Sequence, residues 1–121
     1  HIISESPKKH RITRQEDSRQ MPSSVPPQSY FTSNDVLRLS KELLGMQLCT
    51  RIGGIYTAGK IVETEAYRAP EDKASHAYQN KRTNRTETIF SPGGVAYIYL
   101  CYGIHHLFNI VTGQKDQAHA I

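Results

Sequence analysis

Two carboxylates and a phenol recur at every second position within residues 61–67. Glu63, Glu65 and Tyr67 share parity, so in an extended strand their side chains leave the same face, about 7 Å from one to the next. A carboxylate in such a place can act as a general base on water, and a phenol can stack on a planar ligand. The same spacing fits an edge strand with a solvated acidic face, so the pattern alone leaves both interpretations open.

Three tyrosines form a second pattern near the C-terminal end of the sequence. Tyr97 and Tyr99 share one face of a predicted strand, whereas Tyr102 has the opposite parity and directly precedes Gly103. A turn at this glycine would place Tyr102 at a hairpin tip. Aromatic rings on a sheet can stack on nucleic-acid bases, and a ring at a turn can act as a wedge. Because tyrosine is also common in strands, ordinary sheet packing remains the alternative.

The sequence does not show the spacing of a metal site. His105 and His106 are adjacent, so on a strand they point to opposite faces and cannot hold one metal ion together. A glycine-rich phosphate-binding loop is also missing from the sequence. We therefore predict neither a metal nor a cofactor.

Charge and cysteine content indicate the class of protein. The formal net charge of +4 permits an acidic partner such as nucleic acid without requiring one, and the densest basic cluster beyond residue 20 is Lys81, Arg82 and Arg85. Cys49 and Cys101 lie far apart in strand-like segments, which favours reduced buried thiols, with a disulfide as the alternative. With no apolar run of roughly 18 residues and no signal peptide, we expect a soluble intracellular protein that does not bind membranes.

The elements that must position these residues follow from periodicity and glycine placement. A helix is predicted from Ser33 or Asn34 to Gly45. Strands are predicted over residues 46–51, 55–67, 95–102 and 105–112, with a Gly53-Gly54 turn and the start of another strand at 118–121. This mixture of helix and antiparallel strands indicates the α+β class.

The two ends of the chain carry separate expectations. Residues 1–29 are polar and end in a segment with three prolines, so we expect a disordered tail there and a domain over residues 30–121. Met21 is a candidate natural start, which would make residues 1–20 an upstream addition; a native basic tail is the alternative. Because the predicted last strand has no turn or polar tail after it, we expect the domain to be incomplete at its C-terminus.

Several short motifs follow one another in order along residues 30–121. They are Glu42-Leu-Leu-Gly45, Ile61-Val-Glu-Thr-Glu-Ala-Tyr67, Pro70-Glu-Asp72, Ala74-Ser-His-Ala77, Arg82-Thr83, Pro92-Gly93-Gly94, Tyr97-Ile-Tyr99 and Tyr102-Gly103. Together they resemble the alkyladenine (3-methyladenine) DNA glycosylase family of mammals and many bacteria. The resemblance implies a single α+β domain with a curved antiparallel sheet, flanking helices and a protruding β-hairpin.

The resemblance also assigns catalytic and base-binding roles. Glu65 matches the general base that deprotonates a water for attack on the sugar C1′ atom of a flipped nucleotide. The residues that line the pocket for the extruded base are matched by Tyr67, His76, Tyr99 and Asn109. Asn109 corresponds to a residue thought to disfavour normal guanine.

Two further matches concern the DNA. Tyr102 matches the residue that is inserted through the minor groove into the space left by the base, and Arg85 matches, more loosely, a loop with basic DNA contacts. The implied partner is double-stranded DNA that contains a damaged base, bound by a monomer.

The resemblance implies a monofunctional glycosylase that flips out alkylated or deaminated purines and hydrolyses the N-glycosidic bond, leaving an abasic site. Two alternatives stay open. One is a nucleic-acid binding module that stacks bases without catalysis, and the other is a small interaction domain whose acidic strand contacts protein.

The chain departs from the family in two places. The family continues well beyond the position of Ile121 and there supplies an arginine that helps to position water and phosphate, and the loop over residues 77–81 lacks the expected glycine and arginine pattern. We therefore expect the chain to be weakly active or inactive on its own.

Overall fold

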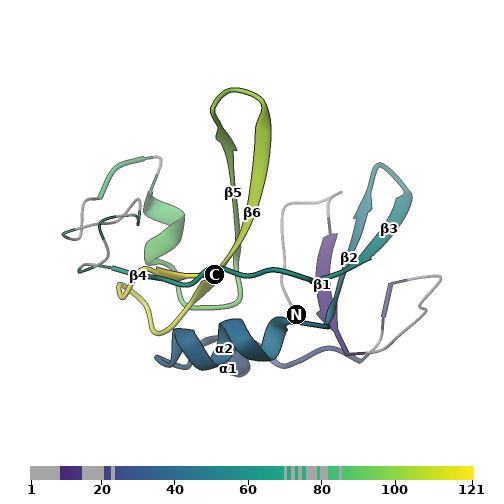
Figure 1. Cartoon of the computed structure of the whole chain (residues 1–121), viewed down its shortest axis with the longest axis horizontal. Coiled ribbons are helices and arrows are strands. Elements are labelled where there is room, and N and C mark those ends of the chain that lie inside the picture. Colours follow the sequence, from purple (N-terminus) through teal and green to yellow (C-terminus); the bar gives the residue numbers. More distant parts are fainter. Residues whose placement is uncertain are drawn as a thin grey trace.

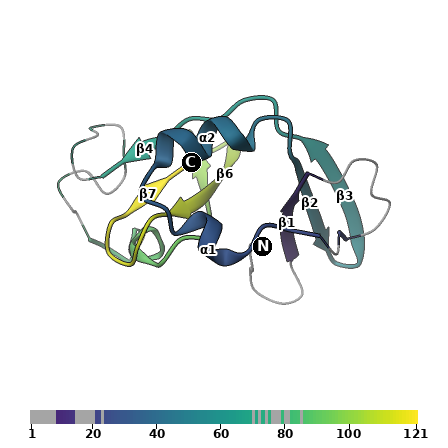
Figure 2. The same cartoon turned by 90° about the horizontal axis from the view of Figure 1, so that it is seen from below.

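The computed structural model describes residues 9–14, 21–22, 24–69, 71, 73, 75, 79, 82–84 and 86–121. The elements are β1 (Lys9–Thr13), α1 (Gln28–Phe31), α2 (Val36–Leu43), β2 (Gln47–Ile52), β3 (Ile55–Lys60), β4 (Tyr67–Arg68), the 3-10 helix η2 (Glu87–Phe90), β5 (Ala96–Cys101), β6 (His105–Thr112) and β7 (His119–Ala120). The strands form two antiparallel sheets, ordered β1-β2-β3 and β4-β7-β6-β5. Helices α1 and α2 lie along one side of both (Figures 1 and 2). The α+β class is confirmed.

Helix α2 forms because apolar side chains recur on one face, where Val36, Leu39 and Leu43 are buried. The predicted helix is confirmed, but its N-cap is Asp35 rather than Ser33 or Asn34. The Asp35 side chain accepts a hydrogen bond from the Arg38 amide, which satisfies one of the donors left over in the first turn.

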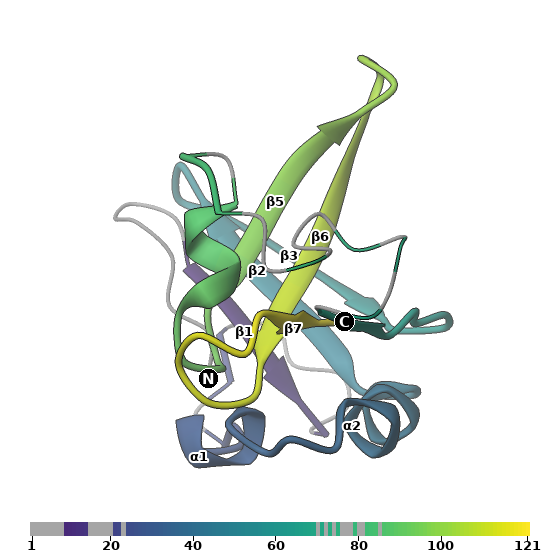
Figure 3. The same ribbon diagram turned by 90° about the vertical axis from the view of Figure 1, so that its left-hand side faces the viewer.

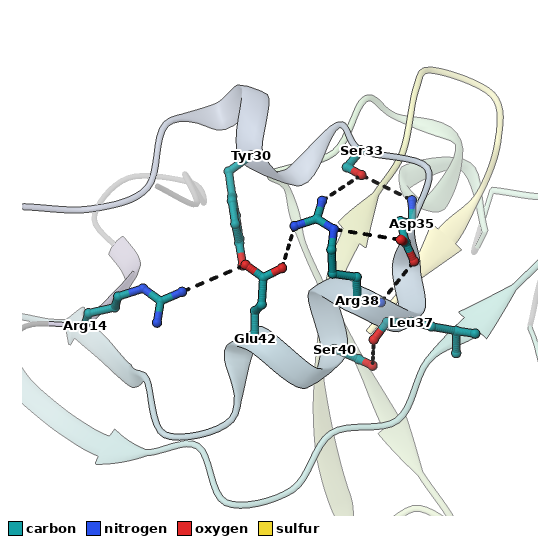
Figure 4. A network of polar contacts seen from close by, with 8 residues as sticks. All are labelled: Arg14, Tyr30, Ser33, Asp35, Leu37, Arg38, Ser40 and Glu42. Atoms are coloured by element: carbon teal, nitrogen blue, oxygen red, sulfur yellow. Dashed lines mark hydrogen bonds and ion pairs between the residues drawn. The ribbon is translucent and has the colours of Figure 1, made fainter.

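The exposed side of α2 carries a small polar network centred on Glu42 (Figure 4). Its carboxylate accepts a hydrogen bond from the Tyr30 hydroxyl at 3.2 Å and forms ion pairs with Arg38 and Arg14. Burial, followed by the nearby Glu42 charge, raises the pKa of Tyr30 above its ordinary value. The network ties α1 and the end of β1 to the helix.

Both predicted hairpins are present. Strands β2 and β3 pair from Gln47↔Lys60 to Ile52↔Ile55 around the Gly53-Gly54 turn, and β5 and β6 pair from Ala96↔Ile110 to Cys101↔His105. The β5–β6 hairpin stands well clear of the rest of the chain (Figures 1 and 3). The predicted protruding hairpin is confirmed, as is the short strand near the end of the chain.

The prediction of one continuous strand over residues 55–67 is wrong. Strand β3 ends at Lys60 and β4 begins at Tyr67, with no regular secondary structure between them. The pairing with the β2 side ends one residue later, at Ile61, whose N–H donates to Met46 O at 2.7 Å and whose carbonyl accepts from Gly45 N–H at 2.8 Å. Residues 61–66 therefore cross from one sheet to the other (Figure 1).

Strand β1 lies within the segment that we expected to be disordered, so that expectation is wrong for residues 9–13. Strand β1 pairs with β2 from Lys9↔Arg51 to Thr13↔Gln47, and Ile12 is fully buried. The Thr13 hydroxyl donates to Ser24 O at 2.6 Å. Composition could not predict this strand, because its order comes from the edge of β2 and from a core supplied by distant residues.

The core has two parts. One cluster joins Ile12 of β1 and the buried face of α2 to Ile110 and Ile121 beside the four-stranded sheet. The other packs Ile89 and Phe90 of η2 against Tyr97 and Val111. Strand β6 contributes Ile110 to the first cluster and Val111 to the second, so both clusters support the strand that carries Asn109.

Two further expectations concern thiols and membranes. Cys49 is a free, buried cysteine, as predicted. Within the part of the chain that the structure describes, none of the helices has the length and apolar character needed to span a membrane.

Candidate functional site

A cavity of about 640 Å³ lies between the β2–β3 hairpin and strand β6. Its lining includes Ile61, Glu63, Thr64 and Glu65 of the segment that crosses between the sheets, and the apolar residues Ile12, Leu43 and Ile110. Four of the predicted site residues line this cavity: Glu65, Tyr67, Tyr99 and Asn109. Residues that are up to 44 positions apart in the sequence therefore meet at one place.

Glu65 and Tyr67 are in direct contact. The Tyr67 hydroxyl donates a hydrogen bond to Glu65 Oε2. Tyr67 is half-buried and its backbone is held by pairing with Ala120 of β7, whereas Glu65 is exposed. A phenol that donates to one carboxylate oxygen restricts the rotation of the carboxylate and leaves the second oxygen available as an acceptor.

An aromatic and amide wall rises from the β5–β6 hairpin on the far side of the cavity. The rings of Tyr97 and Tyr99 are 5.6 Å apart and tilted by 38°. Asn109 is the cross-strand partner of Tyr97 and is buried, with its side-chain amide donating to Leu107 O at 3.5 Å. Tyr67, Tyr99 and Asn109 also line a small adjoining pocket with Ser75. The wall can stack on a flat ligand and offer it a polar contact.

Tyr102 lies at the hairpin tip, as predicted from Gly103. Its side chain is 93% exposed, and its backbone has φ of 51°. Residues other than glycine rarely adopt this left-handed backbone region, which costs them about 1–2 kcal/mol. The structure thus holds a large aromatic ring in solvent on a strained backbone.

Two predicted site residues, His76 and Arg85, lie outside the residues that the structure describes. In the predicted basic cluster, Lys81 is also outside them, but Arg82 is placed. Arg82 forms two hydrogen bonds with Glu87, at 3.0 and 2.9 Å, an ion pair with Asp116 at 3.0 Å, and a cation–π contact with Phe90.

This set of contacts gives Arg82 a structural role. Its hydrogen bonds to Glu87 lower the pKa of that carboxyl and raise the pKa of the guanidinium above its ordinary range. Arg82 ties the loop before η2 to the β6–β7 turn, where Asp116 lies. Glu87 and Phe90 are near Arg82 in the sequence, whereas Asp116 is 34 positions away and its contact could not be read from local pattern.

The cavity contains further polar residues that the sequence motif did not single out as site residues. Lys60 and Glu63 line it beside Glu65. The parity of Glu63 with Glu65 was a usable signal, whereas Lys60 carried none. Among the described residues, no group of three or more His, Cys, Asp or Glu side chains is arranged to hold a metal ion.

Comparison with known proteins identifies the family. Residues 30–121 match the family model described as methylpurine-DNA glycosylase. Relatives named as 3-methyladenine DNA glycosylases are 57% identical over 95 residues in Chlamydia abortus, 52% over 92 residues in Chlamydia pneumoniae and 48% over 91 residues in Clostridium botulinum.

These alignments cover 75–78% of this chain but only 45–50% of each relative, so the chain spans about half the length of the relatives that it matches. The motifs, the β5–β6 hairpin and every residue that lines the cavity except Ile12 lie within the matched residues 30–121. The chain belongs to the methylpurine-DNA glycosylase family.

Proposed function

We propose that the chain carries the base-recognition and water-activating part of a DNA repair glycosylase that removes damaged purines from duplex DNA. The observation that supports this best is the meeting of Glu65, Tyr67, Tyr99 and Asn109 around one cavity. Its volume of about 640 Å³ is within the usual range for small-molecule sites. A base inside a duplex cannot reach such a cavity, so it must be flipped out of the stack.

The proposed reaction is hydrolysis. A purine alkylated at N3 or N7 carries a positive charge, so it departs as a neutral base when the N-glycosidic electron pair moves onto its ring. Water adds to the sugar C1′ atom and gives its proton to the Glu65 carboxylate, leaving an abasic site. One carboxylate suffices because the leaving group already carries charge, in contrast to sugar-cleaving enzymes that use two.

The aromatic residues fit the two other requirements. Tyr67 and Tyr99 can stack on the cationic base through their electron-rich faces, while Asn109 offers an amide to its edge. Tyr102 fits the role of the wedge that fills the gap in the duplex and offsets part of the cost of unstacking. A ring that is 93% exposed gains little from packing, so the strained backbone at Tyr102 supports a role in binding. His76 and Arg85 are proposed as further base and DNA contacts on the resemblance alone.

The proposal is tested by base release. The chain, in molar excess, is incubated with a duplex that holds one 3-methyladenine, and the free base and the abasic site are both quantified. Glu65→Gln should abolish release while duplex binding persists, because the amide cannot take a proton. Unchanged release by this variant would refute the mechanism.

A second candidate function is favoured by the exposure of Tyr102. A module could bind distorted DNA through this ring and the β5–β6 hairpin without cleaving any bond. Tight binding to a duplex with an abasic analogue, together with equal base release by the wild-type chain and by Glu65→Gln, would favour this candidate. In both cases we propose a monomer that acts on double-stranded DNA inside the cell.

A further inference from the structure

Thr64 lies between the two carboxylates of the crossing segment, and its side chain makes a contact that neither of them shares. Its hydroxyl donates a hydrogen bond to the backbone oxygen of Ser40 in helix α2, at 2.8 Å. Thr64 is partly buried, whereas Glu63 and Glu65 are exposed. All three residues line the cavity, and Thr64 is the one whose side chain is also bonded to the helix.

The end of α2 explains why Ser40 can accept this bond. In a regular helix the Ser40 carbonyl would bond to the amide of Leu44, but that amide bonds to Lys41 O at 3.3 Å. The last carbonyls of a helix have no partner within it and must find one elsewhere. The Ser40 hydroxyl donates to Leu37 O at 2.9 Å (Figure 4), so the residue is bonded at both its hydroxyl and its carbonyl.

Among the residues that the structure describes, backbone hydrogen bonds hold the crossing segment near its two ends. Ile61 is fixed by Gly45 and Met46, and Tyr67 is fixed in β4 by pairing with Ala120. Between these points the Thr64 hydroxyl supplies an anchor one residue before Glu65. Without it, rotation of the backbone around residues 63–65 would move the carboxylate relative to the Tyr67 hydroxyl.

We propose that Thr64 is a positioning residue: its hydrogen bond to the end of α2 sets where the Glu65 carboxylate stands in the cavity. The proposal rests on the proposed function only in its consequence for catalysis, because the placement of Glu65 can be measured without any reaction. A displacement of about 1 Å at a reacting group can lower a rate on the order of 10²-fold.

The test compares Thr64→Val, which keeps the shape but removes the hydroxyl, with Thr64→Ser, which keeps the hydroxyl. Thr57→Val is the matched control, because Thr57 lines the same cavity from β3 and is exposed. Carboxyl-labelled glutamate is observed by NMR in each chain, with Glu65→Gln assigning the resonance. Nuclear Overhauser contacts report the proximity of Glu65 to the Tyr67 ring.

We expect Thr64→Val to shift the Glu65 resonance and weaken its contact with Tyr67, while Thr64→Ser and Thr57→Val retain both. Wild-type Glu65 signals in Thr64→Val would overturn the proposal. If Thr64→Val does not fold, Thr64→Ala gives the same comparison. In the release assay, Thr64→Val should lower the maximal rate on the order of 10²-fold with little change in KM, and Thr64→Ser should restore it.

The two proposals fail in different ways. If Glu65→Gln leaves base release unchanged, the proposed function fails, yet the NMR comparison still decides whether Thr64 places Glu65. If Thr64→Val leaves the Glu65 resonance unchanged while Glu65→Gln abolishes release, the positioning role of Thr64 fails and the proposed function stands.

Discussion

The two sheets of the molecule differ in how deeply their strands are buried and in how many site residues they supply. In the four-stranded sheet, the second half of β6 is buried and belongs to both core clusters. In the three-stranded sheet, five of the six residues of β3 are exposed. The aromatic and amide side chains of the candidate site come from the four-stranded sheet, where packing on both faces fixes the backbone. Precise placement of the site depends on that double support.

The two sheets also differ in how much of each lies within the residues that match the family model. All strands of the four-stranded sheet lie within residues 30–121, the part that matches the family. The three-stranded sheet includes β1, which lies outside the match but places Ile12 in the core beside Ile110 and Ile121. Strand β1 lies outside the residues that match the family model, yet its Ile12 lines the cavity.

The largest expected effect comes from Gly93→Ala, beside the four-stranded sheet. A Cβ atom at Gly93 would lie 2.0 Å from the Phe31 carbonyl oxygen. Because this oxygen belongs to the backbone, it cannot move away by a side-chain rotation. That oxygen accepts a hydrogen bond from Gly113 N–H at 2.8 Å, so relief would break the link to α1. We expect a loss of more than about 4 kcal/mol in the free energy of unfolding, measured by urea denaturation.

Gly59→Ala in β3 is the control for that substitution. Its added Cβ meets nothing within 4 Å, so stability should rise by about 0.5–1 kcal/mol. Equal losses for both glycines would contradict the contrast between the sheets.

Ile12→Ala tests whether β1 belongs to the folded domain. Ile12 is 0% exposed, and deleting its branched side chain should cost about 2–4 kcal/mol through lost burial and a new cavity. Ile55→Ala, at a position that is 70% exposed in β3, should change stability by less than about 0.5 kcal/mol. An Ile12 variant as stable as the Ile55 variant would show that β1 does not pack into the core.

Tyr102→Gly separates stability from function at the hairpin tip. Glycine accepts the φ of 51° found there, so the variant should gain about 1 kcal/mol in thermal denaturation. Its affinity for an abasic-analogue duplex should fall, because the ring that would fill the gap is gone. Retained affinity would argue against Tyr102 as the wedge.

The smallest effect is a pH dependence at His119 in β7. Burial, followed by the charge of Arg68, lowers the pKa of His119 below its ordinary value of 6.5. The unfolded chain therefore takes up a proton first, and the stability present above pH 6.5 declines as the pH falls toward the folded-state pKa. His119→Gln should flatten the curve between pH 7 and 5; an identical slope in both chains would contradict this assignment.

The sequence was sufficient to predict features that depend on local pattern. Alternation and glycine placement predicted β2, β5, β6 and the tip at Tyr102, because strand parity and turn chemistry are encoded nearby. The break after Lys60 was not predictable, since the pairing with the β2 side ends at the bonds of Ile61 with Gly45 and Met46, which local alternation does not mark. Nor was β1, whose order comes from the edge of β2. Spacing alone left Glu65 ambiguous, and the family motifs distinguished it from Glu63.

The most direct measurement is the single-turnover release of 3-methyladenine from a duplex by Glu65→Gln and by Glu63→Gln, with duplex binding measured alongside. Both residues line the cavity, so the pair controls for loss of a negative charge there. If Glu65 is the base that activates water, Glu65→Gln should lose at least about 10²-fold in rate, while Glu63→Gln stays within a few-fold of wild type. Equal rates for wild type and Glu65→Gln, or an equal loss in both variants, would contradict this assignment of Glu65.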